Sequence, residues 1–343
     1  MLLATPLTEV VFVRPLVISG EEIRALASMR DIVDVVEESF RELALGHAAL
    51  FPRQSMPIGE SYARFTNGSA FVGGKINRFA TKLLGVNFEN PLKRNMASIG
   101  GAVVLNDSVS GEIIAIIDGT VLTAVRTGAC AGVSARYLAR KNADTIGIFG
   151  AGRVGTEILR AYCAVRNITK AKITDPPAAE KCRKLCKELS EELGIPVVPA
   201  SPKEAVVDSD IIGTATNATE PLFDGKWLKN GAHVSTVAVR MGQAREIDLT
   251  TVRRAKKPVV VDLKEHVLSE KAQDLLIPIE KGLLSEDDLV NLGDVILGKV
   301  SVRTSDRDIT LFKTGGLITE DVVAASRIYD LARSKDVGTE VTL

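Results

Sequence analysis

The residues from Thr145 to Asp175 have the types and the order that a dinucleotide-binding unit needs. A short apolar run leads into the turn GAGRVG, a helical pattern follows, and a second short apolar run ends at Asp175. In such a unit the first glycine allows a tight turn, the second lets the backbone approach a pyrophosphate, and the third lets helix and strand pack closely. Free N–H groups at the helix start then face the phosphates. The residues expected along the pyrophosphate are Gly150, Gly152, Arg153, Val154 and Gly155.

Asp175 also bears on which dinucleotide is bound. It lies 20 residues after Gly155, about where an acid bonds the ribose 2′-hydroxyl of NAD. A carboxylate repels the 2′-phosphate of NADP, and two prolines follow Asp175 instead of an arginine that would pair with that phosphate. We therefore predict NAD, and Arg153 inside the turn leaves NADP as a second choice. The alternative is a glycine turn that binds no nucleotide.

Three cations in the first part of the chain have suggestive surroundings. Arg53 follows a Phe-Pro pair, Lys82 interrupts the apolar run RFATKLLGV, and Arg126 lies in a helical pattern of small residues. The arginine fork binds both oxygens of a carboxylate, and a cation in an apolar stretch is costly unless it has a partner. We predict a clamp for a substrate carboxylate. The alternatives are surface arginines and a lysine that extends from a strand to solvent.

Composition narrows the classes of protein and partner. The chain has 343 residues, 45% of them apolar and 25% charged, and its net charge is zero. This balance is typical of a soluble globular protein and shows no footprint for nucleic acid or an acidic membrane. No apolar run reaches the ~20 residues of a membrane span, and the N-terminal segment lacks the layout of a secretory signal. We expect a cytoplasmic protein of about two domains.

Neither the cysteines nor the histidines support a metal site. Cys182 and Cys186 are four residues apart in a helical pattern, but no further cysteine or histidine lies nearby to complete a zinc site. His47, His233 and His266 are scattered along the chain. We predict no metal and interpret the cysteines as partly buried thiols in a reducing compartment.

The elements that must position these residues change in type along the chain. Residues 17–142 begin with two amphipathic helices, the first with a capping box at Ser19 and Glu22. Strand-like runs follow, and the last two flank a hairpin turn. We expect a mostly antiparallel region with helices on one side. The strand-like runs are FPRQSMPI, RFATKLLGVNF, GGAVVLND and EIIAIIDG.

A helix of small residues from Thr123 to Arg140 is expected to carry the chain onward, and from Ala143 strands and helices alternate. This alternation predicts a Rossmann-type, doubly wound parallel sheet, so the fold class is α/β with a second α+β part. A glycine-rich link at 313–316 and a helix at 317–336 suggest that the chain returns to its first part. The strand candidates are Ile146–Phe149, Ala171–Thr174, Pro196–Val198, Asp210–Thr214, His233–Ala238, Val259–Asp262 and Ile309–Phe312.

From about residue 17 onward the chain resembles the ornithine cyclodeaminase/mu-crystallin family. The matching stretches are DGTVLTAVRTGACAGVSARYLARKN, IGIFGAGRVG, TATNATEPLFDGKWLKNGAHVSTV, NLGDVILGK and ITLFKTGGLITEDVVAA. The resemblance implies a homodimer in which residues 1–125 and 315–343 form a substrate-binding and dimerisation domain. Residues 126–314 would form the NAD-binding domain.

The resemblance also assigns roles to residues. It implies that Arg53, Lys82 and Arg126 hold the substrate carboxylate. Members of the family share a hydride transfer between nicotinamide C4 and the α-carbon of an imino acid. The further residues expected at the cofactor are Thr127, Thr214, Ala215, Val237, Lys313, Thr314 and Gly315. Simple strand-end hydrogen bonding is the alternative for Thr214.

One position departs from the family. Cyclodeaminases and the archaeal alanine dehydrogenases carry an aspartate where this chain has Arg240. Arginine cannot act as a general base, because its pKa stays above ~12. Amine chemistry that relies on the aspartate is therefore disfavoured, and imine reduction is favoured. Arg240 facing the pocket would suit a substrate with a second carboxylate; alternatively it turns outward, or pairs with Glu246 or Asp248.

Lys82 is the predicted catalytic residue. If it is buried near Arg126, burial and like charge both lower its pKa, so that it can protonate the imine nitrogen or hold a water that does. We predict an NAD(H)-dependent oxidoreductase acting on an imino or amino acid, of the imine or ketimine reductase type. The alternatives are ornithine cyclodeaminase, alanine dehydrogenase, and a mu-crystallin-like ligand-binding protein with little turnover.

Overall fold

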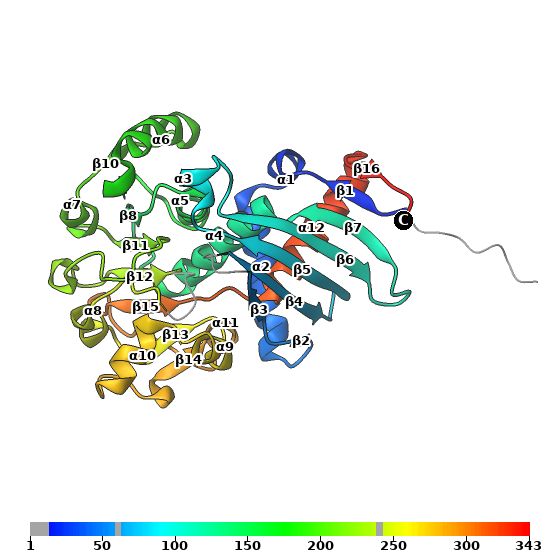
Figure 1. The fold of residues 1–343 in the computed structure, drawn as a ribbon. Helices are drawn as coiled ribbons and strands as arrows, with labels where there is room; N and C mark the ends of the chain where they lie inside the picture. Colours follow the sequence, from blue (N-terminus) through cyan, green and yellow to red (C-terminus); the bar gives the residue numbers. More distant parts are fainter. Residues whose placement is uncertain (1–13, 59–62, 238–242) are drawn as a thin grey trace, which may run out of the picture.

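The computed structural model describes residues 14–58, 63–237 and 243–343, and their strands form two eight-stranded sheets. Figure 1 shows the two sheets side by side, with α4 (Gly119–Leu138) running between them. Within these described ranges, no helix is both long and apolar enough to cross a membrane.

The first sheet is mainly antiparallel and is built from the two ends of the chain. Its order is β16-β1-β7-β6-β5-β4-β2, with β3 paired to β4, and only β1 and β7 run parallel. The strands are β1 (Leu16–Ile18), β2 (Ala48–Leu50), β3 (Gln54–Pro57), β4 (Arg64–Val72), β5 (Arg78–Val86), β6 (Ile99–Asp107), β7 (Ile113–Asp118) and β16 (Thr339–Glu340). β6 and β7 form the predicted hairpin.

The sequence interpretation missed β4, which is the partner of β5 along nine residues. Its middle, Asn67-Gly68-Ser69, looks like a turn because asparagine, glycine and serine favour turns. The structure shows why a glycine is needed there: a Cβ on Gly68 would lie 2.8 Å from Ile318 of α12 (Ile318–Lys335). Close contact between helix and sheet therefore produces the turn-like sequence.

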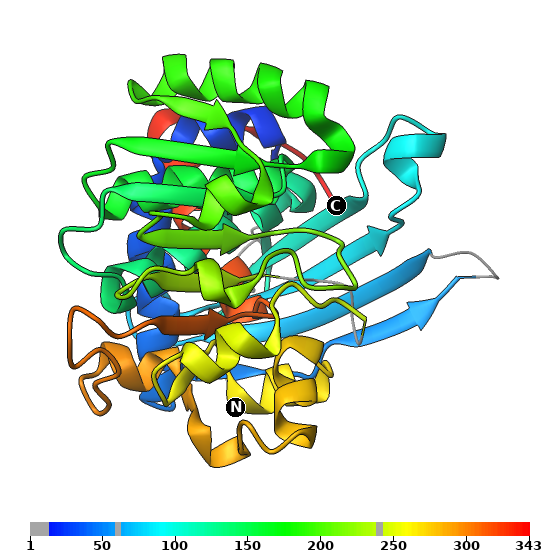
Figure 2. The same ribbon diagram turned by 90° about the vertical axis from the view of Figure 1, so that its left-hand side faces the viewer.

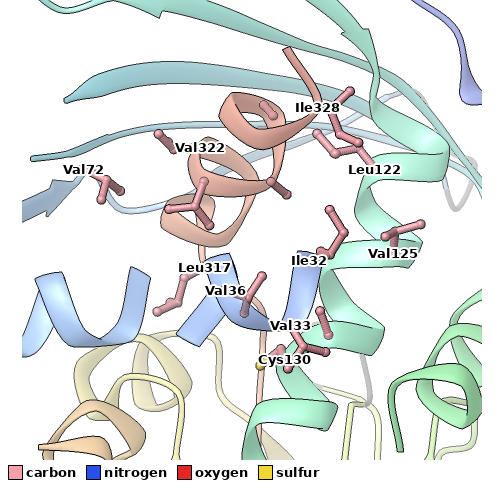
Figure 3. Packing of buried hydrophobic residues seen from close by; sticks show 14 of the residues in the cluster. Ile32, Val33, Val36, Val72, Leu122, Val125, Cys130, Leu317, Val322 and Ile328 are labelled. Atoms are coloured by element: carbon pink, nitrogen blue, oxygen red, sulfur yellow. The ribbon is translucent and has the colours of Figure 1, made fainter. Parts of the chain in front are cut away.

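Three helices cover one face of this sheet. α2 (Met29–Ala44), α4 and α12 pack together through buried apolar side chains, and Figure 3 shows Val36, Leu122 and Val322 among them. Capping boxes at Ser19 and Ser28 start α1 (Gly20–Leu26) and α2, and the first of these was predicted. A short α3 (Asn90–Lys93) lies between β5 and β6.

The second sheet is wholly parallel, in the order β10-β9-β8-β11-β12-β15-β13-β14. The chain leaves β8 in one direction through β9 and β10 and returns to its other side with β11, so the topological switch point lies between β8 and β11. The strands are β8 (Thr145–Phe149), β9 (Lys170–Thr174), β10 (Val197–Pro199), β11 (Ile211–Thr214), β12 (His233–Thr236), β13 (Val259–Val261), β14 (Leu289–Asn291) and β15 (Thr310–Lys313).

Separate apolar cores cover the two faces of this sheet, as a doubly wound fold requires. Neighbouring residues of β11 point to opposite cores: Ile211 packs with α5 and α6, and Ile212 with α7 and α8. Figure 2 shows the helices around the parallel strands. The helices are α5 (Arg153–Val165), α6 (Ala179–Leu193), α7 (Pro202–Val206), α8 (Leu249–Arg254), α9 (Lys264–Ser269), α10 (Gln273–Glu280), α11 (Leu292–Ile296) and the 3-10 turns Pro176–Ala178, Gly225–Trp227 and Glu286–Asp288.

Most predicted bounds differ from the structure by a few residues. α4 begins at Gly119, not Thr123, because Asp118 accepts a hydrogen bond from the backbone N–H of Val121 and so caps the helix. The predicted return of the chain is confirmed: α12 packs on β4, β5 and β6, and β16 pairs with β1.

Candidate active site

The glycine turn follows β8 at the switch point of the parallel sheet, and its three glycines differ in their surroundings. Gly150 has a φ of 104°, which favours glycine, and a Cβ on Gly155 would collide with the carbonyl oxygen of Gly150. A Cβ on Gly152 would meet no protein atom within 4 Å. The fold therefore needs the first and third glycines, whereas the second leaves open space in front of the turn.

This open space adjoins the start of α5 and the carboxylate of Asp175. Gly152 is the N-cap of α5 and no side chain caps the helix, so its first N–H groups remain available to a phosphate. The Oδ2 atom of Asp175 accepts a hydrogen bond of 2.8 Å from the N–H of Ala151, which holds the carboxylate beside the turn. Arg153 is exposed and Val154 half-buried. These residues fit a dinucleotide.

Four charged side chains are buried together where β5, α4 and α12 meet. Lys82 Nζ lies 2.7 Å from Asp321 Oδ1, and the same oxygen lies 3.2 Å from Arg126 Nε. Arg126 Nη1 lies 3.0 Å from Glu320 Oε2. We call Lys82, Arg126, Glu320 and Asp321 the charge cluster; each is less than 5% exposed.

Burial changes the protonation of the charge cluster. Desolvation, and then the positive charge of Arg126, lower the pKa of Lys82 to about 7, against the pull of Asp321. This is the direction that the sequence predicts. Desolvation raises the pKa of Glu320 to about 7, although Arg126 opposes the shift, whereas the two cations keep the pKa of Asp321 below its ordinary value. The cluster can therefore exchange a proton near neutral pH.

The loop that joins β15 to α12 is held from both sides. The carboxylate of Asp262 accepts hydrogen bonds from Thr314 Oγ1 and from the N–H groups of Gly315 and Gly316, at 2.7 to 2.9 Å. Arg53 Nη2 donates to the carbonyl oxygen of Gly316 at 2.7 Å. The loop thus links Asp262, after the end of β13, to Arg53, in the segment between β2 and β3.

A second buried network fixes the ends of β11 and β15. Thr214 Oγ1 and Thr216 Oγ1 donate to the carboxylate of Glu246, at 2.6 and 2.9 Å. Lys313 Nζ lies 3.3 Å from Asp274 Oδ2. The hydroxyl of Thr214 therefore makes a strand-end hydrogen bond, and Lys313 is almost fully buried beside an acid.

A pocket extends from the charge cluster to the start of β4 and the end of β5. The three predicted clamp residues, Arg53, Lys82 and Arg126, all line it, so the fold brings them together although they are far apart in the chain. The remaining lining residues are Arg64, Thr66, Asn67, Gly68, Leu84, Val86, Phe88, Ile99, Thr123, Gly315 and Ile318. The pocket therefore has a cationic base and largely apolar walls.

The other predicted residues are placed as follows. Thr127 follows Arg126 on α4 and is buried, as are Val237 and Thr314; Ala215 is half-buried after β11. Arg240 lies outside the described residues. Among the described residues, no group of three or more potential ligands from His, Cys, Asp and Glu could hold a metal ion.

Sequence reasoning missed the acids that pair with the cations. Glu320 and Asp321 stand side by side in the run LITEDVVAA, which is otherwise mostly apolar. Adjacent acids on a helix with apolar residues all around it indicate buried charges, since burial demands a partner. Arg64 was missed with β4.

Comparisons with known proteins agree with this geometry. The model of the ornithine cyclodeaminase/mu-crystallin family matches residues 13–336. The chain belongs to this family. The family's Delta(1)-pyrroline-2-carboxylate reductase from Bacillus cereus is 33% identical over 332 residues, covering 95% of this chain and 99% of that protein.

Two solved structures of this family extend the likeness to three dimensions. Delta(1)-pyrroline-2-carboxylate reductase of Thermococcus litoralis, in complex with NADH and L-proline, is 35% identical with a TM-score of 0.90, covering 95% of this chain and 100% of that chain. An archaeal alanine dehydrogenase dimer with bound NAD is 28% identical with a TM-score of 0.86, covering 96% and 99%. The predicted family and fold class are confirmed.

Proposed function

We propose that this chain is an NAD(H)-dependent imine reductase that adds hydride to the α-carbon of an α-imino acid. The observation that carries the proposal is the position of Lys82 and Arg126, buried at the base of a pocket with apolar walls. The pocket reaches Gly315, in the loop beyond β15 of the dinucleotide-type sheet. The relatives named for Delta(1)-pyrroline-2-carboxylate support a cyclic α-imino acid as a substrate.

The substrate carboxylate binds at the cationic base. Arg126 presents a fork that suits two carboxylate oxygens, and Gly316 makes room for it, because a Cβ there would collide with the guanidinium. Glu320 and Asp321 hold Arg126 in place, so little side-chain freedom is lost when the substrate binds. The carbon skeleton then lies against apolar residues such as Leu84 and Ile318.

Lys82 supplies the proton. With a pKa of about 7, it is protonated in a large fraction of molecules at neutral pH and still releases its proton readily. It donates to the imine nitrogen, which makes the α-carbon more electrophilic, and Asp321 stabilises the charged lysine beforehand. When bound, NADH supplies the hydride that the α-carbon accepts.

NAD is the better fit at the glycine turn. The carboxylate of Asp175 is fixed beside the turn by Ala151, where it can accept from a ribose hydroxyl and would repel a 2′-phosphate. The complexes of the two relatives with NADH and NAD support this choice. Residues 126–314 would hold the cofactor, and residues 1–125 with 315–343 the substrate.

We infer a homodimer formed through the open face of the first sheet. Side chains on the face opposite α2, α4 and α12 include Val17 and Leu83, which are 38% and 39% exposed, and the partly exposed Phe71, Phe79 and Ile116. In Figure 1 this face is turned toward the viewer and carries no helix among the described elements. The dimeric alanine dehydrogenase supports the inference.

Light scattering on Leu83→Glu tests the homodimer. Leu45→Glu, at an exposed position after α2, is the matched control. A dimer that survives Leu83→Glu would argue against this interface.

The free cysteines support a reducing, cytoplasmic location.

The activity test is NADH oxidation with preformed Delta(1)-pyrroline-2-carboxylate, its six-membered homologue, and 2-oxo acids with ammonia. We expect turnover of preformed imines by wild type and a loss of about 100-fold or more in Lys82→Met, the range of a lost general acid. Ornithine in the same panel detects cyclodeaminase activity. Absence of imine turnover, or full activity in Lys82→Met, would contradict the proposal.

A further inference from the structure

Arg64 is a fourth cation of the pocket and differs from the other three. Arg126 and Lys82 have buried acids as partners, and Arg53 donates to backbone carbonyls and lies 3.9 Å from Glu270. Arg64 is half-buried and lines the same pocket, yet among the described residues its guanidinium makes no ion pair or side-chain hydrogen bond. Its charge is therefore available to a ligand.

The strand register places Arg64 at the far end of the pocket from Lys82. In the β4–β5 pair Gly68 lies opposite Lys82 and Arg64 opposite Val86, and alternate residues point to the same face. Four residues along β4 span about 13 Å of backbone, and the long side chains of Lys82 and Arg64 both line the pocket between these two positions. The apolar side chain of Leu84 lies between them along β5, and Val86 lies beside Arg64.

A substrate that reaches both ends would need an anionic group at each. In the proposed function, the base binds one carboxylate at Arg126. An arginine fork in a partly desolvated position binds a second carboxylate through two parallel hydrogen bonds, which favours a carboxylate over a neutral group. The apolar residues between the ends suit the carbon spacer of such a molecule.

We propose that Arg64 binds a second carboxylate, so that the preferred substrates of this reductase are α-imino dicarboxylates. This deepens the proposed function and rests on it. In the reaction the C=N bond is reduced by hydride addition at the α-carbon and proton addition at nitrogen; the second carboxylate is unchanged and serves only for binding. Arg64 is thus a specificity-determining residue.

The kinetic test compares two substrates in wild type, Arg64→Leu and Arg64→Lys. Iminosuccinate, formed from oxaloacetate and ammonia, carries the second carboxylate, and Delta(1)-pyrroline-2-carboxylate lacks it. We expect wild type to prefer iminosuccinate, and Arg64→Leu to lose about 100-fold in kcat/KM for it, which corresponds to about 2.7 kcal/mol. The value for the monocarboxylate should stay within about threefold, since that substrate makes no carboxylate contact there.

Arg183→Leu, on the exposed surface of α6, is the matched control and should leave both substrates unaffected. Arg64→Lys should retain part of the preference, because the charge remains but the fork is lost. Equal losses for both substrates in Arg64→Leu, or no preference for iminosuccinate in wild type, would overturn the proposal.

A binding measurement separates this proposal from the proposed function. Calorimetry of the NADH-loaded protein with L-aspartate and L-proline needs no turnover. If wild type binds aspartate more tightly than proline and Arg64→Leu does not, the role of Arg64 is supported even if no imine is reduced. Equal affinity of the two proteins for aspartate would refute it, whatever their activity.

Discussion

Replacing Asp321 by asparagine tests how the fold tunes Lys82. Asp321 Oδ1 accepts from Lys82 at 2.7 Å and from Arg126 at 3.2 Å inside the charge cluster. Asparagine keeps the shape of the side chain and one acceptor oxygen, but it removes the negative charge. Because that charge raises the pKa of Lys82 against desolvation and Arg126, the substitution must lower the pKa further.

The size of the effect follows from the lost interaction. A hydrogen bond between charged groups is worth about 1.5–3 kcal/mol, which is about one to two pH units. The pKa of Lys82 is about 7 in wild type and would fall to about 5–6 in Asp321→Asn. The fraction of protonated lysine at neutral pH would then drop about 5- to 50-fold.

The assay is kcat/KM for imine reduction as a function of pH. In the proposed mechanism protonated Lys82 is the active form, so wild-type activity should fall as pH rises through about 7. In Asp321→Asn this limb should move to lower pH, while the activity at acid pH approaches that of wild type, a recovery that a misfolded variant would not show. Glu320→Gln is the control, since the pKa of Glu320 is also about 7, and it should retain a limb near that of wild type. An unchanged limb in Asp321→Asn would refute the assignment of Lys82.

Three further predictions concern stability and the cofactor. The pKa of Lys82 is about 7 in the folded chain and lies below its ordinary value of 10.5. Between these two pH values the unfolded chain therefore binds more protons than the folded chain. Stability therefore rises with pH across that window, by about 5 kcal/mol from this group. Denaturant titrations should show this slope in wild type and not in Lys82→Met. Gly152→Ala should leave the melting temperature near wild type but weaken NADH binding, whereas Gly155→Ala should cost about 1–3 kcal/mol of stability through its clash with the turn; equal melting temperatures would contradict this contrast. Asp175→Ser should weaken NADH binding about tenfold, because a charged hydrogen bond is lost, and it should reduce the preference for NADH over NADPH. Fluorescence titration with both cofactors measures the two affinities, and an unchanged ratio between them would contradict the role of Asp175.

The parts of the site that are local in the chain were predictable. The turn after β8, the start of α5 and Asp175 lie within one strand–helix–strand unit, so their spacing alone carries the geometry. The doubly wound sheet follows in the same way from alternating apolar strands and helices. For the same reason the capping box of α1 was visible in four residues.

The parts that depend on distant contacts were not predictable from pattern. Lys82 and Asp321 are 239 residues apart, and Arg126 and Asp321 are 195 apart. The cations stood out because they interrupt apolar runs, but nothing local names their partners. Gly68 made β4 look like a turn, because the glycine serves the approach of α12 and not the strand itself.

The two ends of the pocket differ in how well they tolerate mutation. The base, formed by the charge cluster, tolerates it poorly, and the outer end at Arg64 tolerates it better. Each member of the cluster is buried against another, and removing one partner of a buried pair leaves an uncompensated charge at a cost of about 3–5 kcal/mol. Arg64, at the outer end of β4, has no such constraint among the described residues. In evolutionary terms, mutation can explore new substrates at the outer end while selection for a stable fold preserves the chemistry at the base. A lineage built on this fold can thus diversify in what it reduces without losing how it reduces it.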